Sequence, residues 1–154
     1  MSELVDWGKS LLSFSTPVQE EYAQAAPGVL EKLSADDFRE WAATGAQLAD
    51  RGFRSWQASL EYFRATPEVL ELVPLRRVLA WARLGGDLAE MSAELSCAFV
   101  RAGPQTLAHL NQIETVAWGG LGARLYKGEW QSGALAVKFF QATAPMFPRV
   151  TLFD

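Results

Sequence analysis

The sequence contains too few cysteine and histidine residues to build most metal sites or a disulfide framework. Its 154 residues include one cysteine, Cys97, and one histidine, His109. A zinc site of the Cys/His type uses four such ligands, and a disulfide framework needs paired cysteines. A helix that binds metal through two histidines is excluded for the same reason. We therefore expect no metal site of these kinds, and no cofactor.

Long apolar runs and an excess of basic charge are also missing. No window approaches the roughly 18 apolar residues of a membrane-spanning helix, so we expect no membrane span. The segment Met1–Trp7 has an acidic flank and no long apolar run, unlike a signal peptide. The formal net charge of −4 gives no reason to expect a nucleic-acid partner. A lone cysteine is compatible with a reducing compartment, and we expect a cytoplasmic location.

One residue pattern occurs three times in the chain. It reads Pro-x2-Leu-x10-Trp-[Ala/Gly]-x2-Gly-x2-Leu, and its successive prolines are 40 and 37 residues apart. Several matched positions at the same spacing in three copies indicate an internal repeat. Because residues that recur in every copy are expected to serve the fold, we assign structural roles to Trp41, Gly45, Pro67, Trp81, Gly85, Pro104, Trp118 and Gly122.

The tryptophan segment of each copy has the periodicity of an amphipathic helix. Trp41, Gly45 and Leu48 follow one another at intervals of four and three residues, which places them on one helix face. A glycine inside a helix costs about 1 kcal/mol relative to alanine. Its return in each copy indicates a packing reason, and we expect a neighbouring helix to approach closely beside the indole.

Helix-start signals divide each copy further. Ser34 precedes the first tryptophan helix as an N-cap. Thr66-Pro67 and Gly103-Pro104 are typical of an N-cap followed by a proline in the first turn. Each copy is thus expected to hold a tryptophan helix, a second helix that ends near Ala-x-Pro, and a short helix that begins at the proline.

These units predict the fold class and the domain organisation. A unit of about 40 residues with two helices and a short third matches the size of HEAT and armadillo repeats. We expect an all-α, right-handed stack of helical hairpins, an α-solenoid of about three and a half repeats of 37–41 residues. A single domain would span 1–154, with a partial cap repeat at 1–33 and repeats at about 34–73, 74–110 and 111–148. The apolar segment Met146–Phe153 either packs back on the last helices or leads into a further domain; we favour the second, which would make the chain a fragment.

Residues that occur in one copy only are candidates for partner binding. Phe53, Trp56 and Trp130 lie in inter-helix segments that the middle copy lacks. An exposed aromatic residue there would be a contact anchor, with local packing of a longer turn as the alternative. Arg76 and Arg77 belong to the densest basic cluster, which suits an acidic partner or a solvated helix face.

Other single residues favour structural roles. Arg64 and Arg101 are expected at helix C-termini, where positive side chains complement the helix dipole. Cys97 stands among apolar neighbours, as expected for a buried inert thiol, and His109 has no second ligand nearby. The first 40 residues hold eight acidic and three basic residues, a net charge of −5, which suits a polar cap or a basic partner.

No motif identifies a reaction. Patterns such as G-x-S-x-G and H-E-x-x-H are absent. Gly119-Gly-Leu-Gly122 is similar to a dinucleotide loop, but it follows a helical segment and its glycines match the repeat. The carboxylates that could serve an enzyme in a groove are Glu40, Asp50, Asp87 and Glu90. Two of them, Asp50 and Glu90, are equivalent in successive copies, which favours solvated structural positions.

The repeat also carries a family resemblance. It is seen in Trp81-Ala-Arg-Leu-Gly-Gly-Asp-Leu-Ala89 and in Phe63-Arg-Ala-Thr-Pro67-Glu-Val-Leu70. Over about residues 25–145 the chain resembles the helical repeats that precede von Willebrand factor A domains in some bacterial NorD- and CoxE-like proteins. The resemblance implies an adaptor that works beside a MoxR-type AAA+ ATPase, in cofactor or metal insertion. The chain has no DxSxS run, so the metal-dependent adhesion site of such a protein would lie elsewhere.

The expected function is a non-enzymatic scaffold or adaptor of a bacterial protein system that binds a protein partner. One alternative is a small helical enzyme or ligand carrier that uses the groove carboxylates. Another is an amphipathic helical protein that binds a surface. A closed pocket with converging carboxylates would favour the enzyme, and an open groove would favour the scaffold. The sequence leaves the oligomeric state open.

Overall fold

The chain folds as a series of α-helices. The computed structural model describes residues 2–128 and 133–149, and no β-strand occurs within these ranges. The helices are α1 (Ser2–Ser10), α2 (Thr16–Lys32), α3 (Ala35–Ala49), α4 (Trp56–Leu72), α5 (Leu75–Ala89), α6 (Ala93–Arg101), α7 (Gly103–His109), α8 (Gln112–Lys127), α9 (Gly133–Thr143) and the 3₁₀ helix η1 (Ala144–Arg149). Trp130, one of the candidate contact residues, lies outside the described residues, as does the segment 150–154.

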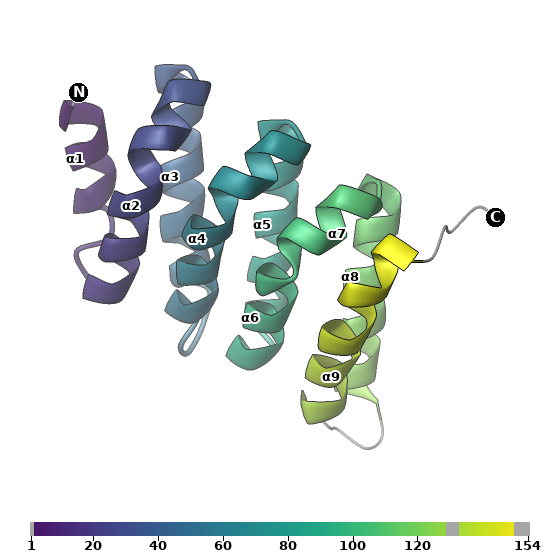
Figure 1. The fold of residues 1–154 in the computed structure, drawn as a ribbon. Helices are drawn as coiled ribbons and strands as arrows, with labels where there is room; N and C mark the ends of the chain where they lie inside the picture. The colour runs from purple at the N-terminus through teal and green to yellow at the C-terminus, as the bar shows by residue number, and fades with distance from the viewer. Residues whose placement is uncertain (1, 129–132, 150–154) are drawn as a thin grey trace.

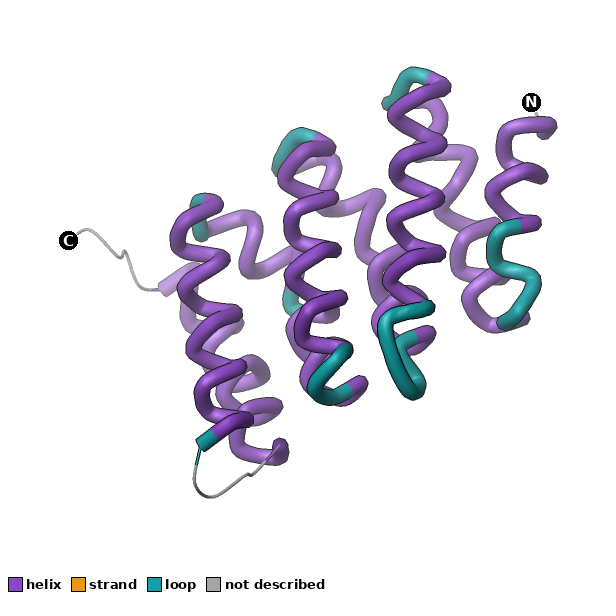
Figure 2. The backbone as a smooth tube through the Cα atoms, turned by 180° about the vertical axis from the view of Figure 1, so that it is seen from behind, coloured by secondary structure: helices purple, strands orange, loops and turns teal. Residues whose placement is uncertain are grey.

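The helices lie in two layers that follow the chain from one end to the other. In Figure 1, α2, α4, α6 and α9 pack in series in the front layer, with α3, α5 and α8 behind them. Figure 2 shows α3, α5 and α8 side by side from the opposite direction. Helices α1 and α9 lie at opposite ends of this array (Figure 1). No helix in the described part of the chain is long and apolar enough to cross a membrane.

Side-chain caps begin α3, where the sequence predicts one, and α8. The Oγ atom of Ser34 accepts a hydrogen bond from the backbone N–H of Asp37 at 3.2 Å, which caps α3. Asn111 and Glu114 form a reciprocal capping box at the start of α8. All three tryptophan helices, α3, α5 and α8, are present.

The expected helix break at each proline is wrong at two of the three positions. Helix α2 continues through Pro27 and α4 continues through Pro67. Only before Pro104 does a helix end as expected, where α6 stops and α7 begins. Thr66 is therefore not an N-cap. Its hydroxyl donates a hydrogen bond to the carbonyl of Tyr62 at 2.6 Å, inside α4.

The positions of the two arginines follow from this correction. Arg101 is the last residue of α6, as expected, but Arg64 lies in the middle of α4. The helix dipole acts mainly in the last turn of a helix, so it does not explain Arg64. Both side chains instead form ion pairs with glutamates of the preceding helix in the same layer.

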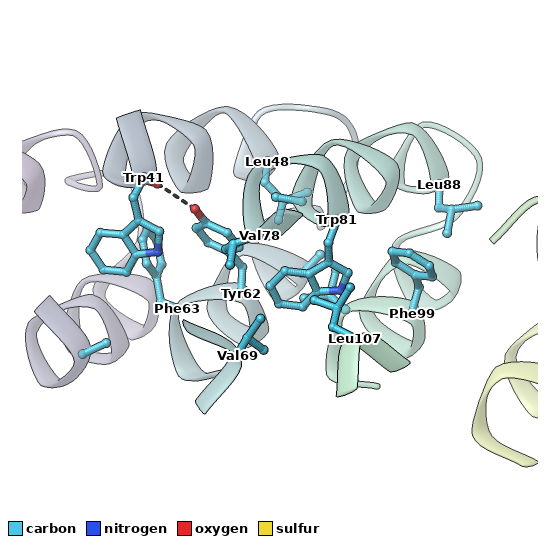
Figure 3. Packing of buried hydrophobic residues seen from close by; sticks show 14 of the residues in the cluster. Trp41, Leu48, Tyr62, Phe63, Val69, Val78, Trp81, Leu88, Phe99 and Leu107 are labelled. Carbon is cyan, nitrogen blue, oxygen red and sulfur yellow. Dashed lines mark hydrogen bonds between the residues drawn. The ribbon is translucent and has the colours of Figure 1, made fainter. Parts of the chain in front are cut away.

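Aromatic rings fill the space between the two layers. The side chains of Trp41 and Trp81 are fully buried, and that of Trp118 is nearly so. Figure 3 shows the indole of Trp41 beside Phe63, and the Tyr62 hydroxyl directed at the Trp41 carbonyl, to which it donates a 2.9 Å hydrogen bond. The ring centroids of Trp41 and Phe63 are 5.2 Å apart in an edge-to-face arrangement, the geometry that aromatic pairs favour.

The three buried indoles differ in their hydrogen bonds. The Nε1–H of Trp41 donates to Thr66 Oγ1 at 3.1 Å, and that of Trp118 donates to Thr143 Oγ1 at 2.8 Å. The Nε1–H of Trp81 is buried and has no hydrogen-bond partner in the described structure. At the position that corresponds to Thr66, the middle copy has a glycine, which supplies no hydroxyl.

The repeated glycines make room for side chains of the paired helix. A Cβ atom added to Gly45 would overlap the ring of Phe63 in α4, and one added to Gly122 would overlap a phenylalanine ring of α9. At Gly85 the added Cβ would lie 2.7 Å from Cγ2 of Val100 in α6. The close approach expected at these glycines is therefore made by the side chains of a neighbouring helix.

Candidate functional site: an apolar groove between α5 and α8

An open groove of about 360 Å³ separates the tryptophan helices α5 and α8. Its walls are mainly apolar and are formed by Leu84, Leu88, Met91, Val116, Gly119, Gly120 and Ala123. Three charged residues border one end of the groove: Asp87 in the last turn of α5, Glu90 directly after that helix, and Lys127 at the end of α8. At that end the Tyr126 hydroxyl donates to the carbonyl of Met91 at 2.9 Å, which joins α8 to the turn that follows α5. The groove is suited to apolar side chains with polar groups at one end.

Gly120 differs from the repeated glycines because nothing fills the space beside it. Apart from the backbone of α8 itself, no heavy atom of the described residues lies within 4 Å of a Cβ added at this position. The glycine therefore weakens α8 by about 1 kcal/mol relative to alanine without any packing contact within the described chain to account for it. It does leave room on the groove wall for the backbone of another molecule to come close.

The apolar surface of the groove continues along the exposed side of α8. Val116 is 46% exposed, and Ile113, one turn earlier, is 81% exposed. The residues that correspond to Ile113 in the other tryptophan helices are charged, Asp36 and Arg76. Ile113 is thus an exposed apolar residue found in one copy only, and this difference between the copies is a signal in the sequence that identifies it.

The loop between α3 and α4 adjoins this groove and is held firmly. The Oγ atom of Ser55, fully buried, accepts hydrogen bonds from two loop N–H groups and donates to the Ala49 carbonyl at 2.6 Å. The Arg51 guanidinium donates to Asp87 at 2.6 Å and to Glu90 at 3.1 Å. These contacts fix the loop against the C-terminal end of α5, where the groove begins.

Phe53 stands at the tip of this loop and is 83% exposed. The guanidinium carbon of Arg54 lies 5.0 Å from the centre of its ring, within the range of a cation–π contact. Arg54 also has a φ of 61°, a conformation that is uncommon for residues other than glycine. Trp56 begins α4 and is half-buried against the core. Of the predicted aromatic anchors, Phe53 is therefore the one that the structure leaves exposed, and Trp130 lies outside the described residues.

Arg76 and Arg77 do not form one basic patch. Arg76 is exposed, whereas the Nη2 atom of Arg77 donates to the Leu110 carbonyl at 2.8 Å and to the Thr115 hydroxyl at 3.3 Å. Burial, and then the neighbouring charge of Arg76, lower the pKa of Arg77. Arg77 therefore joins α5 to the start of α8.

The candidate carboxylates do not converge. Asp87 and Glu90 both pair with Arg51, Glu40 lies 3.7 Å from an Arg83 nitrogen, and Asp50 is exposed. Across the described ranges, no three residues of the Asp, Glu, His and Cys types lie close enough together to hold a metal ion. His109 is exposed at the end of α7.

A buried glutamate connects three helices of the front layer. Glu61 of α4 is almost completely buried, and its Oε1 accepts from Arg101 of α6 at 2.9 Å and from Arg64 of α4 at 3.4 Å. Arg64 in turn donates to Glu21 of α2 at 2.7 Å. No pattern in the sequence predicts this role of Glu61, because it depends on a residue 40 positions away.

Cys97 lies beside this cluster and is expected to react slowly. Its Sγ atom is 3.6 Å from Arg101 Nη2, and burial raises the pKa of the thiol more than the arginine lowers it. Because the thiolate is the reactive form, reaction with Ellman's reagent near neutral pH should be slower than for an exposed cysteine, and should accelerate as the pH rises. Arg101→Gln should slow the reaction further. A rate equal to that of an exposed thiol would contradict this account.

No family model, no curated protein and no solved structure matches the chain. The groove, the loop that carries Phe53 and the packing of the helices are therefore the features that bear on its function.

Proposed function

We propose that the chain is a non-enzymatic scaffold that binds a protein partner. Its architecture would be a right-handed α-solenoid of about three and a half repeats, with a partial cap at 1–33 and repeats at about 34–73, 74–110 and 111–148. Recurrent contacts support this arrangement, because Gly45 and Gly122 each meet a phenylalanine ring and Trp41 and Trp118 each bond to a threonine 25 residues later. A stack of such units buries apolar faces that one unit could not bury alone.

The proposed occupant of the groove is an amphipathic helix of the partner. The open apolar groove between α5 and α8 is the observation that carries this proposal. Helices bind such grooves with an apolar face, and the open space at Gly120 would let the backbone of the partner helix approach α8. Phe53 would add an aromatic contact at the end of the groove, on a loop that needs little ordering.

A scaffold fits the described side chains better than an enzyme does. Both carboxylates at the groove pair with Arg51, and the groove is open rather than enclosed. A catalytic acid or base would instead be expected in a closed pocket beside other reactive groups. We place the scaffold in the cytoplasm of a bacterium, as the sequence analysis suggests.

The resemblance to NorD- and CoxE-like repeats suggests a finer identity for the partner. On this proposal the partner belongs to a system with a von Willebrand A domain and a MoxR-type AAA+ ATPase. The resemblance concerns structural positions of the repeat, so it assigns no binding residue.

Site-specific crosslinking tests the groove. A photoreactive phenylalanine derivative at position 116 should crosslink, in native lysate, to a helical segment of one protein, and a synthetic peptide of that segment should bind the purified chain. Val116→Asp should weaken peptide binding at least tenfold, about 1.4 kcal/mol, because it places a charge on the apolar wall.

Leu72 supplies the matched control. Leu72 is 47% exposed, close to the 46% of Val116, and ends α4 away from the groove. Leu72→Asp should leave peptide binding unchanged, and a crosslinker at position 72 should not capture the same segment. Equal capture at positions 72 and 116, or a peptide affinity that Val116→Asp does not change, would overturn the proposed site.

A further inference from the structure

The array of helices carries a series of ring contacts that stops at its C-terminal end. Helices α2, α4 and α6 of the front layer each carry an aromatic ring at an equivalent position. Each of these rings lies against the tryptophan of the following tryptophan helix, α3, α5 or α8. The three pairs are Tyr22 with Trp41, Tyr62 with Trp81 and Phe99 with Trp118, with ring centroids 5.7, 5.8 and 5.5 Å apart. Tyr22, Tyr62 and Phe99 are fully buried, whereas the next ring in the series, Phe139 of α9, is only partly buried.

Other positions that are buried in the inner helices are more exposed at the same end of the array. The residue four before each ring is fully buried in α2, α4 and α6 but is 48% exposed at Leu135 in α9. The leucine seven after each tryptophan is buried at Leu48 and Leu88 and partly buried at Leu125. The residue three after Trp118, Leu121, is 47% exposed. We call this surface of α8 and α9 the C-terminal end face.

The charge at this face is the reverse of that at two of the three inner junctions, α2 with α4 and α4 with α6; in α6 the same position holds the uncharged Ala98. The residue directly before the ring is Glu21 in α2 and Glu61 in α4, and each pairs with an arginine of the next helix in the layer, 2.7 and 2.9 Å away. In α9 the residue at this position is Lys138, which is exposed and forms no ion pair with the described part of the chain. A binding partner that continued the layer would therefore carry a carboxylate opposite Lys138.

The N-terminal end of the same chain supplies that charge. Between α4 and α6, Glu61 lies beside Arg101 and close to Cys97, the residue two before the next ring. The residue two before the ring of α2 is Glu20, which is exposed. A second α2 packed on α9 in the register of the inner helices would thus bring Gln24, at the position of Arg101, and Glu20, at the position of Cys97, close to Lys138. The first 40 residues as a whole have a net charge of −5.

We propose that the C-terminal end face of one copy binds the N-terminal end of a second copy, so that the chains associate head to tail. This inference rests on the repeat arrangement proposed above. Such a contact joins two different surfaces, and an assembly of any length still presents one free N-terminal end and one free C-terminal end face. The association is therefore open-ended, and its extent should rise with protein concentration.

Sedimentation equilibrium tests the association. The average mass should rise above 17.0 kDa as the concentration of the chain increases, and it should fall again in high salt, which screens the charge pair. Leu121→Asp should keep the mass at that of the monomer. Lys138→Glu should weaken association about tenfold, and Lys138→Glu combined with Glu20→Lys should restore most of it.

The controls separate this proposal from that of the groove. Phe53→Asp changes a side chain that is 83% exposed and far from α9 along the chain, so it should not alter self-association. Leu121→Asp should leave binding of the groove peptide unchanged, which also shows that the variant is folded. A chain that stays monomeric at every concentration while it binds the peptide would overturn the head-to-tail contact and leave the scaffold proposal standing. A charge swap that fails to restore association would overturn the assigned register.

Discussion

Gly45→Ala is expected to lower the free energy of unfolding by about 2 kcal/mol. The added methyl group must displace the ring of Phe63, which is held in edge-to-face contact with Trp41 and Tyr22 at centroid distances of 5.2 and 5.4 Å. Such overpacking costs up to about 3 kcal/mol, and the better helix propensity of alanine returns about 1 kcal/mol. Gly45→Leu should prevent folding. Urea denaturation followed by far-ultraviolet circular dichroism measures both effects.

A glycine in open space provides the control. Gly28 lies in α2, and a Cβ atom added there would have no heavy atom of the described residues within 4 Å apart from the backbone of its own helix. Gly28→Ala should therefore stabilise the chain, by at most about 1 kcal/mol. If Gly45→Ala were as harmless as Gly28→Ala, the close contact with Phe63 would not constrain the fold.

A double-mutant cycle assigns the cost to one contact. Phe63→Leu replaces the ring by a more flexible side chain, so Gly45→Ala should cost less in that background than in the parent chain. Gly85→Ala should cost less than Gly45→Ala, because the group it meets is a single methyl of Val100, 2.7 Å from the added Cβ. Additive effects of Gly45→Ala and Phe63→Leu would contradict the assignment.

The features of the fold that depend on local sequence could be predicted. The tryptophan helices have their apolar residues at helical spacing, and Ser34 caps α3 through an atom three residues away. The repeated glycine implied a close contact without naming the side chain that makes it. Phe63 and Val100 are separated from their glycines by an inter-helix loop, so the identity of the contact depends on how two helices pack.

The helix breaks at the prolines could not be predicted from local signals. Proline removes one backbone hydrogen bond and favours a helix start, which is why Thr66-Pro67 suggested one. Helix α4 nevertheless continues through the proline, because buried residues lie on both sides of it: Tyr62 and Phe63 before it and Val69 after it. In the middle copy Gly103 precedes the proline, and the helix is interrupted there, since glycine is a poor helix former.

The candidate site depends even more on long-range packing. Leu84 and Val116 look like ordinary apolar residues of two amphipathic helices, and the groove exists because α5 and α8 leave space between them. The exposure of Phe53 could be proposed from its position in an extra loop. The anchoring of that loop could not, because Arg51 reaches Asp87 across 36 residues of sequence.

Trp41→Phe is expected to destabilise the chain by about 1 to 2 kcal/mol more than Trp81→Phe. Both changes remove the same part of a fully buried side chain, so their cavity costs should be similar. Only Trp41 also loses a hydrogen bond, the 3.1 Å contact of its Nε1–H with Thr66 Oγ1. Trp81→Phe removes a buried N–H group that has no partner in the described structure, and so relieves a desolvation cost.

Thr66→Val separates the hydrogen bond from the shape of the site. Valine keeps the volume of threonine but removes the hydroxyl, so Thr66→Val should destabilise the parent chain and should cost less once Trp41 has been replaced by phenylalanine. The hydroxyl also donates to the Tyr62 carbonyl at 2.6 Å, so part of its cost should remain in the double variant. Equal losses for Trp41→Phe and Trp81→Phe in urea denaturation would show that the indole N–H contributes nothing at either position. Stability would then come from ring packing alone, and the glycine of the middle copy would have no energetic consequence for Trp81.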